Sequence, residues 1–319
     1  MLDYTREQIK NLDFSSFARN PVLKPFGLTF VVADPSLLLP EDTPDGRWHM
    51  FFHTFFGVYD FVSEDGIKFT ENQKIASRAF RPNINKTQDG YVLYYERIPS
   101  LPVALFSTLG LGKWNSAIYM KKSPDLKTWS ESSPVITSAC GLELDGRGSA
   151  ISNPFYLMDG ETERLYFSCG QTFIEDCGFC EPTYISCAER KSGEAKFVPS
   201  GKPIISPDRN DRYLNLCSGC LKVYKVKDGY IGIQNGIYEE NGASRSAILM
   251  LESVDGISFS FVRPLVEPSF SDDAKWMKQF VYASHLVEHN GTFRLYFNAR
   301  DTSNPVKGRE CIGFYEANI

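Results

Sequence analysis

A strand-turn-strand pattern recurs five times along this 319-residue chain and limits the fold more than any other feature of the sequence. Each copy opens on a variable residue, continues through about four apolar or β-branched residues, crosses a turn and enters an aromatic run. The copies open at Asp34, Arg81, Asn153, Gly219 and His285, which are 47, 72, 66 and 66 residues apart. A period of this size indicates stacked supersecondary units.

The turn in each copy predicts a β-hairpin. All five copies carry Asp-Gly or Asn-Gly there, at Asp45, Asp89, Asp159, Asp228 and Asn290. These pairs tolerate the positive φ angles of a type I′ turn. A third strand follows in each copy, and in several copies a fourth. We therefore predict an all-β fold, a five-bladed β-propeller with blades starting near residues 31, 79, 150, 216 and 282.

The fifth copy ends too early to contain an outer strand of its own. We predict that the segment from Val22 to Phe30 supplies this strand and closes the ring, because an unpaired sheet edge is a liability. The repeat runs through the whole chain, so a single domain over residues 1–319 is expected.

Composition and charge limit the kinds of molecule that this protein is expected to bind. The net charge of −5 disfavours nucleic acid, which is bound by clustered positive charge. No apolar run approaches the roughly 20 residues of a membrane span, and the acidic, polar start of the chain does not resemble a secretory signal. A cytoplasmic location is expected, and the sequence carries no signal for an oligomeric state.

The geometry of a propeller places candidate site residues together. The first strand of each blade lines the central tunnel, so the residues that open these strands meet at one pocket floor. These residues are Asp34, Arg81, Asn153, Ser218 or Gly219, and His285. The loops between second and third strands lie on the same face and form the predicted rim. Rim candidates for substrate binding are Arg97, Trp114, Glu239, Arg300 and Asp301.

These strand openings, the Asp-Gly hairpins and the closing run from Tyr296 to Asp301 resemble the five-bladed propeller glycosidases, with glycoside hydrolase family 43 as the best model. The resemblance covers about Val31 to Tyr315. It implies a catalytic base aspartate in blade one, a modulating aspartate in blade three and an acid glutamate before Gly-Pro in blade four. It also implies a tunnel-facing histidine in blade five, which often helps to hold a central ion such as calcium.

Only part of this motif set is present. Asp34 matches the base, and His285 matches the tunnel histidine. Asn153 stands where the modulating carboxylate belongs, and Ser218 stands where the acid belongs. Because glycoside cleavage normally needs two carboxyl groups, the general acid must come from elsewhere or be lost.

Three alternatives follow for the missing acid. A rim carboxylate could serve, and the candidates are Glu96, Glu143, Glu175, Glu239 and Asp301. His285 could protonate the leaving group, since imidazole titrates near neutral pH. Otherwise the propeller binds or transfers sugars without hydrolysis. The leading hypothesis is a glycosidase with Asp34, His285 and Glu96 as catalytic candidates.

Arg81 opens blade two and bears on the type of sugar. Arginine binds carboxylates and phosphates bidentately, so a pocket with Arg81 on its floor and Arg97 and Arg300 on its rim favours an anionic sugar, such as a uronate, a sugar phosphate or a nucleotide sugar. The alternative is that Arg81 pairs with Asp34 or Asp301 and fixes the ring.

Two CxxC pairs raise the question of a metal. Cys177, Cys180, Cys217 and Cys220 fall on the pocket face of adjacent blades, a spacing that allows a four-thiolate zinc site. The second pair lies on a predicted strand, where residues three apart point to opposite faces. We therefore predict reduced, mostly buried thiols and no bound metal or cofactor.

Overall fold

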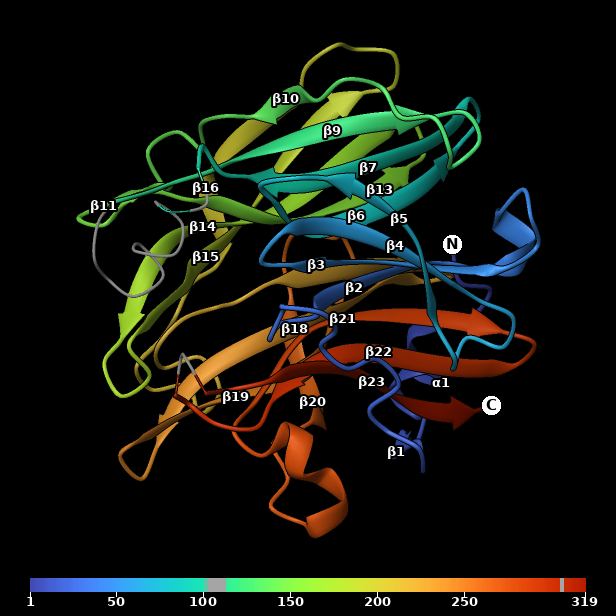
Figure 1. Ribbon diagram of the computed structural model, residues 1–319. Coiled ribbons are helices and arrows are strands. Elements are labelled where there is room, and N and C mark those ends of the chain that lie inside the picture. Colours follow the sequence, from blue (N-terminus) through green and yellow to red (C-terminus); the bar gives the residue numbers. More distant parts are fainter. Residues whose placement is uncertain (101, 103–112, 305–306) are drawn as a thin grey trace.

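The structure is a computed structural model that describes residues 1–100, 102, 113–304 and 307–319. Five antiparallel sheets of four strands each dominate it (Figure 1). The innermost strands β2, β6, β13, β17 and β21 contact one another in cyclic order, so the sheets form a closed ring. This confirms the predicted all-β, five-bladed propeller.

The strands of each blade follow one another in sequence, from the axis outward. Blade one contains β2 (Ala33–Leu38), β3 (Trp48–Thr54), β4 (Gly57–Ser63) and β5 (Thr70–Ala76). Blade two contains β6 (Ala79–Thr87), β7 (Gly90–Arg97), β9 (Ala117–Ser123) and β10 (Ser133–Ile136). Blade three contains β13 (Ile151–Asp159), β14 (Thr162–Ile174), β15 (Phe179–Lys191) and β16 (Val198–Ile205). Blade four contains β17 (Leu221–Val226), β18 (Gly229–Glu240), β19 (Ala243–Ser253) and β20 (Ser260–Val266).

Blade five combines the two ends of the chain. It contains β21 (Phe280–His289), β22 (Thr292–Arg300), β23 (Glu310–Asn318) and β1 (Ser15–Ser16). Outside the blades lie a small sheet of β8 (Trp114–Asn115), β11 (Leu144–Asp145) and β12 (Gly148–Ser149), the helix α1 (Arg6–Lys10), and the 3-10 turns η1 (Pro40–Asp42) and η2 (Asp272–Met277). Within the described residues, no helix has the length and apolarity needed to cross a membrane.

The N-terminal closure of the ring is confirmed, but its position differs from the prediction. The outer strand is β1, in which Ser15 and Ser16 pair with Glu316 and Tyr315. The predicted segment from Val22 to Phe30 forms no strand. It makes an isolated bridge between Leu23 and Ile312, and Val22 N and Phe30 O form further backbone hydrogen bonds with Ile312 and Glu310. A cis peptide bond before Pro21 separates β1 from this segment.

Removing residues 1–30 is expected to destabilise the protein severely. The deletion exposes the edge of β23 and removes Ile9, Leu12 and Leu23, whose side chains are all buried. Burial of three such side chains contributes about 5 kcal/mol, a large share of a typical folding free energy. The melting temperature measured by circular dichroism should fall by more than 10 °C or so. An unchanged melting temperature would refute this role.

The variable residue that opens the repeat sits at a break in the first strand of blades one to three and shortly before the first strand of blade four. Asp34, Arg81, Asn153 and Gly219 all have positive φ angles, of 56°, 52°, 49° and 57°. For residues other than glycine this conformation is uncommon, and each instance costs roughly 1 kcal/mol or more. The ladder skips across Asp34, Arg81 and Asn153, which are therefore free to turn toward the axis.

The position of the same break in blade five shows that the sequence alignment of this blade was wrong by three residues. Its register shifts between Val281 and Ser284, so Tyr282 occupies the place of Asp34, and the predicted His285 lies three residues further along β21. No Asp-Pro or Asn-Pro pair marks this copy, which explains the wrong alignment in the sequence.

His285 instead belongs to a set of hydrogen bonds that fasten neighbouring blades. Its Nδ1 accepts from the backbone N–H of Leu37 at 2.7 Å and so joins blade five to blade one. Three equivalent bonds join other blades: Ser36 Oγ accepts from Ile84 N, Asn83 Oδ1 from Tyr156 N, and the Tyr224 hydroxyl from Leu286 N. Because Nδ1 is an acceptor here, His285 is neutral, and burial together with the charge of Lys222 lowers its pKa to about 3.

Candidate active site

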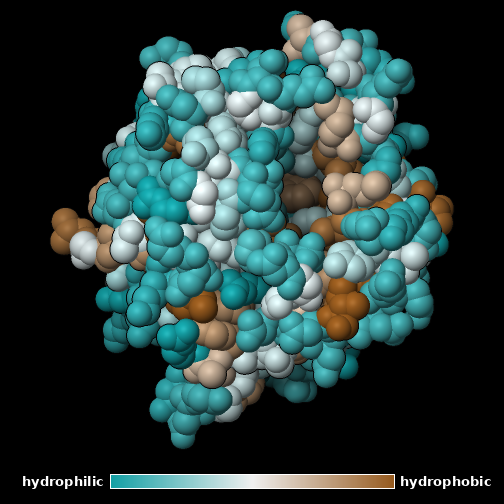
Figure 2. Space-filling model, turned by 90° about the vertical axis from the view of Figure 1, so that its right-hand side faces the viewer, coloured by the Kyte–Doolittle hydropathy of each residue, from teal (hydrophilic) through white to brown (hydrophobic). Residues whose placement is uncertain are grey.

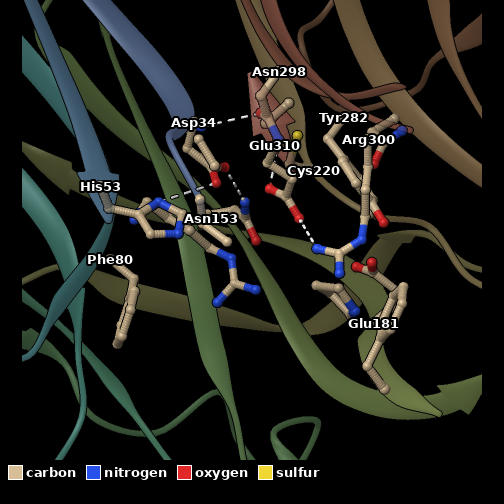
Figure 3. A pocket seen from close by; sticks show the side chains of 18 of the residues that line it. Asp34, His53, Phe80, Asn153, Glu181, Cys220, Tyr282, Asn298, Arg300 and Glu310 are labelled. Atoms are coloured by element: carbon tan, nitrogen blue, oxygen red, sulfur yellow. Dashed lines mark hydrogen bonds and ion pairs between the residues drawn. The ribbon is translucent and has the colours of Figure 1, made fainter. Parts of the chain in front are cut away.

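A cavity of about 460 Å³ opens at the end of the ring where the first strands begin. Each of the five blades contributes one residue to its floor: Asp34, Arg81, Asn153, Gly219 and Tyr282. Aromatic side chains dominate its walls: Phe30, Phe55, Phe80, Trp114 and Phe179. A few convergent polar groups within an apolar pocket are typical of a small-molecule site. Figure 3 shows this arrangement from close by.

Asp34 lies at the centre of the polar floor and is buried. Its Oδ1 accepts from Asn153 Nδ2 at 3.2 Å, and its backbone N–H donates to Asn298 Oδ1 at 3.1 Å (Figure 3). Burial raises the pKa of Asp34, and the charges of Arg81 and Lys222 and the Asn153 bond oppose this rise. Burial and the neighbouring positive charges therefore shift the pKa of Asp34 in opposite directions.

His53 on β3 contacts Asp34, with 3.3 Å between Nδ1 and Oδ2. The backbone N–H of Arg81 donates to the same Nδ1, also at 3.3 Å, so this nitrogen is an acceptor and the ring is neutral. Burial and the charge of Arg81 lower the pKa of His53 well below its usual value. His53 therefore adds no positive charge beside Asp34.

Arg81 is anchored from behind by a buried carboxylate. Its guanidinium forms an ion pair with Glu96, which is fully buried on β7 and also accepts from Trp114 Nε1 at 3.0 Å. Burial would lower the pKa of Arg81, but the charges of Glu96 and Asp34 outweigh it and raise this pKa. Glu96 thus fixes Arg81 and Trp114 and does not line the cavity.

Glu181 on β15 is a carboxyl group of the cavity that we did not single out in the sequence. Burial raises its pKa to about 8; the charge of Arg81 opposes this, while Glu310 and Asp34 reinforce it. The Tyr282 hydroxyl is hydrogen-bonded to Glu181. Glu181 therefore carries a proton at neutral pH and faces the same cavity as Asp34.

Glu310 on β23 is the third carboxyl group of the cavity, and its two oxygens are held by partners. Oε1 accepts from Arg300 at 2.9 Å and Oε2 from Asn298 at 3.2 Å (Figure 3). Arg300 in turn donates to the carbonyls of Thr302 and Asn304, at 3.0 and 2.8 Å. Glu310 and Arg300 therefore form a fixed ion pair, which leaves Glu181 and Asp34 as the carboxyl groups without a dedicated cation.

The structure brings together about half of the residues predicted from the sequence. Asp34, Arg81, Asn153, Trp114 and Arg300 line the cavity. Ser218 does not: it is fully buried, and its neighbour Gly219 takes the place on the floor. Arg97 lies over the ring of Tyr119, Glu239 is exposed, and Asp301 accepts from the backbone of Arg309. None of the predicted rim acids, namely Glu96, Glu143, Glu175, Glu239 and Asp301, lines the cavity.

His285 lies beyond the floor, toward the opposite end of the ring. That face carries both chain termini and is hollowed near its middle, with a hydrophobic interior (Figure 2). Phe155, Tyr224 and His285 line this hollow and contact one another, with ring centroids 5.5 to 6.3 Å apart. His285 is therefore separated from the cavity that contains Asp34, which corrects its predicted place on the pocket floor.

The four cysteines of the two CxxC pairs lie in and behind the cavity. Cys180 and Cys220 line the cavity, while Cys177 and Cys217 are buried behind it. All eight cysteines carry free thiols. Among the residues that the structure describes, no three His, Cys, Asp or Glu side chains converge as metal ligands.

No family model matches this sequence, and no curated protein sequence is detectably similar to it. Solved structures, however, resemble it over nearly the whole chain. The catalytic domain of the GH62 α-L-arabinofuranosidase from Coprinopsis cinerea has a TM-score of 0.63 at 14% identity and covers 97% of this chain and 98% of its own.

Two further structures support the same fold. The α-L-arabinofuranosidase of Podospora anserina, solved in complex with cellotriose, has a TM-score of 0.59 at 14% identity, covering 97% of this chain and 98% of its own. A thermostable family-43 glycoside hydrolase has a TM-score of 0.60 at 12% identity, covering 92% and 91%. The chain therefore has the fold of the five-bladed propeller glycoside hydrolases, which confirms the resemblance drawn from the sequence at the level of structure.

Proposed function

We propose that this protein is a glycoside hydrolase in which Glu181 is the general acid and Asp34 is the base or nucleophile. The observation that carries the proposal is a pair of carboxyl groups in one cavity whose surroundings differ. Burial raises the pKa of both groups, and the charge of Arg81 opposes this rise at both. Lys222 and the Asn153 hydrogen bond also lower the pKa of Asp34, whereas Glu310 and Asp34 raise the pKa of Glu181 further. Two carboxyl groups with different surroundings are what an acid and a base of this kind require.

In this reaction the protonated Glu181 donates its proton to the oxygen of the scissile glycosidic bond. Asp34 either activates a water molecule or attacks the anomeric carbon, and the anomer of the first product, observed by NMR, distinguishes these outcomes. The Tyr282 hydroxyl holds Glu181 in place, and Asn153 holds Asp34. Glu181 therefore replaces His285 and Glu96, the two candidates for the general acid that we drew from the sequence.

The charges of the cavity favour a neutral sugar over the anionic one suggested by Arg81 alone. Arg81 is paired with Glu96, and Arg300 is paired with Glu310. A uronate or phosphate group would therefore meet two arginines that are already neutralised, close to Asp34. Aromatic walls such as Phe55 and Trp114 suit the apolar faces of a sugar ring.

A sugar-binding or glycan-transferring propeller is the second candidate. It is favoured by Ser218, which is buried at the position where glycoside hydrolase family 43 has its general acid. This alternative predicts saturable binding of a sugar, measured by calorimetry, without release of a free reducing end. Hydrolysis that depends on Glu181 would exclude it.

The test is a panel of aryl glycosides assayed between pH 4 and 10. The panel should include arabinofuranosides, since two of the similar structures are arabinofuranosidases, and matched neutral and uronic sugars. We expect a bell-shaped profile of kcat/KM. Activity should fall above about pH 8, where Glu181 loses its proton, and fall on the acid side as Asp34 gains one. A rate that continues to rise beyond pH 9 would contradict Glu181 as the acid.

A further inference from the structure

Asp34 is surrounded by ionisable groups from every blade. Each of them can be considered in turn as a source of positive charge for the Asp34 carboxylate. They are His53 on β3, Arg81 on β6, Glu181 on β15, Cys220 and Lys222 in blade four, and Glu310 on β23. A buried carboxylate is stable only if a positive charge or hydrogen bonds compensate for its lost hydration. The question is which group supplies that charge.

Most of these groups either carry no positive charge or are ion-paired. Arg81 is paired with Glu96, although its charge still lowers the pKa of Asp34, and Arg300 is paired with Glu310. His53 is neutral because its Nδ1 accepts a backbone hydrogen bond. Asn153 contributes a single neutral hydrogen bond to Asp34.

Lys222 remains as the cation of this set that forms no ion pair with any described residue. It is 4% exposed and lies on β17, the innermost strand of blade four, two residues after Cys220 of the cavity lining. Within the described chain, no carboxylate lies within 4 Å of its Nζ, so it forms no ion pair. Its ammonium instead lies 5.4 Å from the centre of the Phe155 ring, a cation–π contact.

In the central channel, the rings of Phe155, Tyr224 and His285 contact one another between Lys222 and the hollow of the opposite face, which they line. A charge enclosed in this way is poorly screened by water and salt, so it acts strongly on groups above it.

We infer that Lys222 is a positioning residue for the reaction proposed above: its enclosed, unpaired ammonium acts together with the Arg81 guanidinium to keep Asp34 ionised beneath the substrate. The inference rests on the proposed function for its kinetic consequence, but the ionisation of Asp34 can be observed without a substrate. The same ammonium disfavours a calcium ion in this channel, because two cations would then share it.

The experiment compares Lys222→Met with Lys222→Arg, and with Lys68→Met as a surface control, since Lys68 is exposed on blade one. In Lys222→Met the acid limb of the kcat/KM profile should move upward by about one pH unit or more, a loss of about tenfold or more at the acid end of the profile. Lys222→Arg should restore the limb, and Lys68→Met should leave it in place. An unmoved limb in a folded Lys222→Met variant would overturn the inference.

Two measurements keep the inference independent of activity and of the folding of Lys222→Met. Infrared difference spectra between the wild type and Asp34→Asn give the titration of the Asp34 carboxyl group directly; this titration should move upward in Lys222→Met even if no substrate is ever found. In the wild type, the same titration should be nearly unchanged between 20 mM and 500 mM NaCl, because Lys222 is enclosed. A marked upward shift in high salt would show that exposed charges, not Lys222, keep Asp34 ionised.

Discussion

Replacing Glu181 with glutamine is expected to lower kcat/KM for glycosides with poor leaving groups by about 10²- to 10⁴-fold. Glutamine has nearly the same shape but carries no acidic proton, so the departing oxygen must leave as an alkoxide. The loss should be much smaller for a dinitrophenyl glycoside of the same sugar, because dinitrophenolate leaves readily without protonation. Measuring both substrates isolates the proton donation from any general damage to the site.

Glu175→Gln provides the matched control. Glu175 is an exposed carboxylate in the turn that joins β14 to β15, the strand that carries Glu181. Its replacement should leave both rates unchanged. Equal losses for the two leaving groups in Glu181→Gln would indicate a structural role for Glu181, and undiminished hydrolysis would remove it from the mechanism.

Asp34→Asn is expected to reduce turnover of every substrate by at least about 10³-fold. An amide neither accepts the proton of a water molecule nor attacks the anomeric carbon at a useful rate. Unlike Glu181→Gln, this loss should not depend on the leaving group. The variant should fold normally, because asparagine tolerates the left-handed backbone at position 34 and its Oδ1 still accepts from Asn153.

The comparison for this variant is Asp301→Asn. Asp301 accepts from the backbone of Arg309 and does not line the cavity, so its replacement should preserve the rate. Melting temperatures of both variants would show whether the fold is intact. Wild-type turnover in a folded Asp34→Asn variant is the outcome that excludes Asp34 as base or nucleophile.

The repeat and its hairpins could be predicted because their signals are local. Asn290 and Gly291 lie between His289 and Thr292, which pair at the end of the β21–β22 hairpin, and both have the positive φ angles that a type I′ turn requires. Asp34 could be placed because the Asp-Pro pair marks the break in β2. Closure by an N-terminal strand followed from the missing edge of blade five.

The partners of Asp34 could not be predicted, because they depend on packing between blades. Glu181 and Glu310 lie on third strands, where nothing local distinguishes them from exposed strand carboxylates. Glu96 was taken for a rim acid because its pairing with Arg81 becomes visible only when β6 and β7 are in register. Tyr282 was missed because the break in β21 contains no proline.

Burial of His285, which accepts the hydrogen bond from Leu37, and the charge of Lys222 limit the acidity that the folded ring can withstand. The folded ring keeps His285 neutral down to about pH 3, whereas an unfolded chain takes up a proton near the ordinary value of 6.5. Between these limits each unit of falling pH favours the unfolded chain by about 1.4 kcal/mol. The contact between blade five and blade one is therefore sensitive to acid through a group that is separate from the chemistry of the cavity.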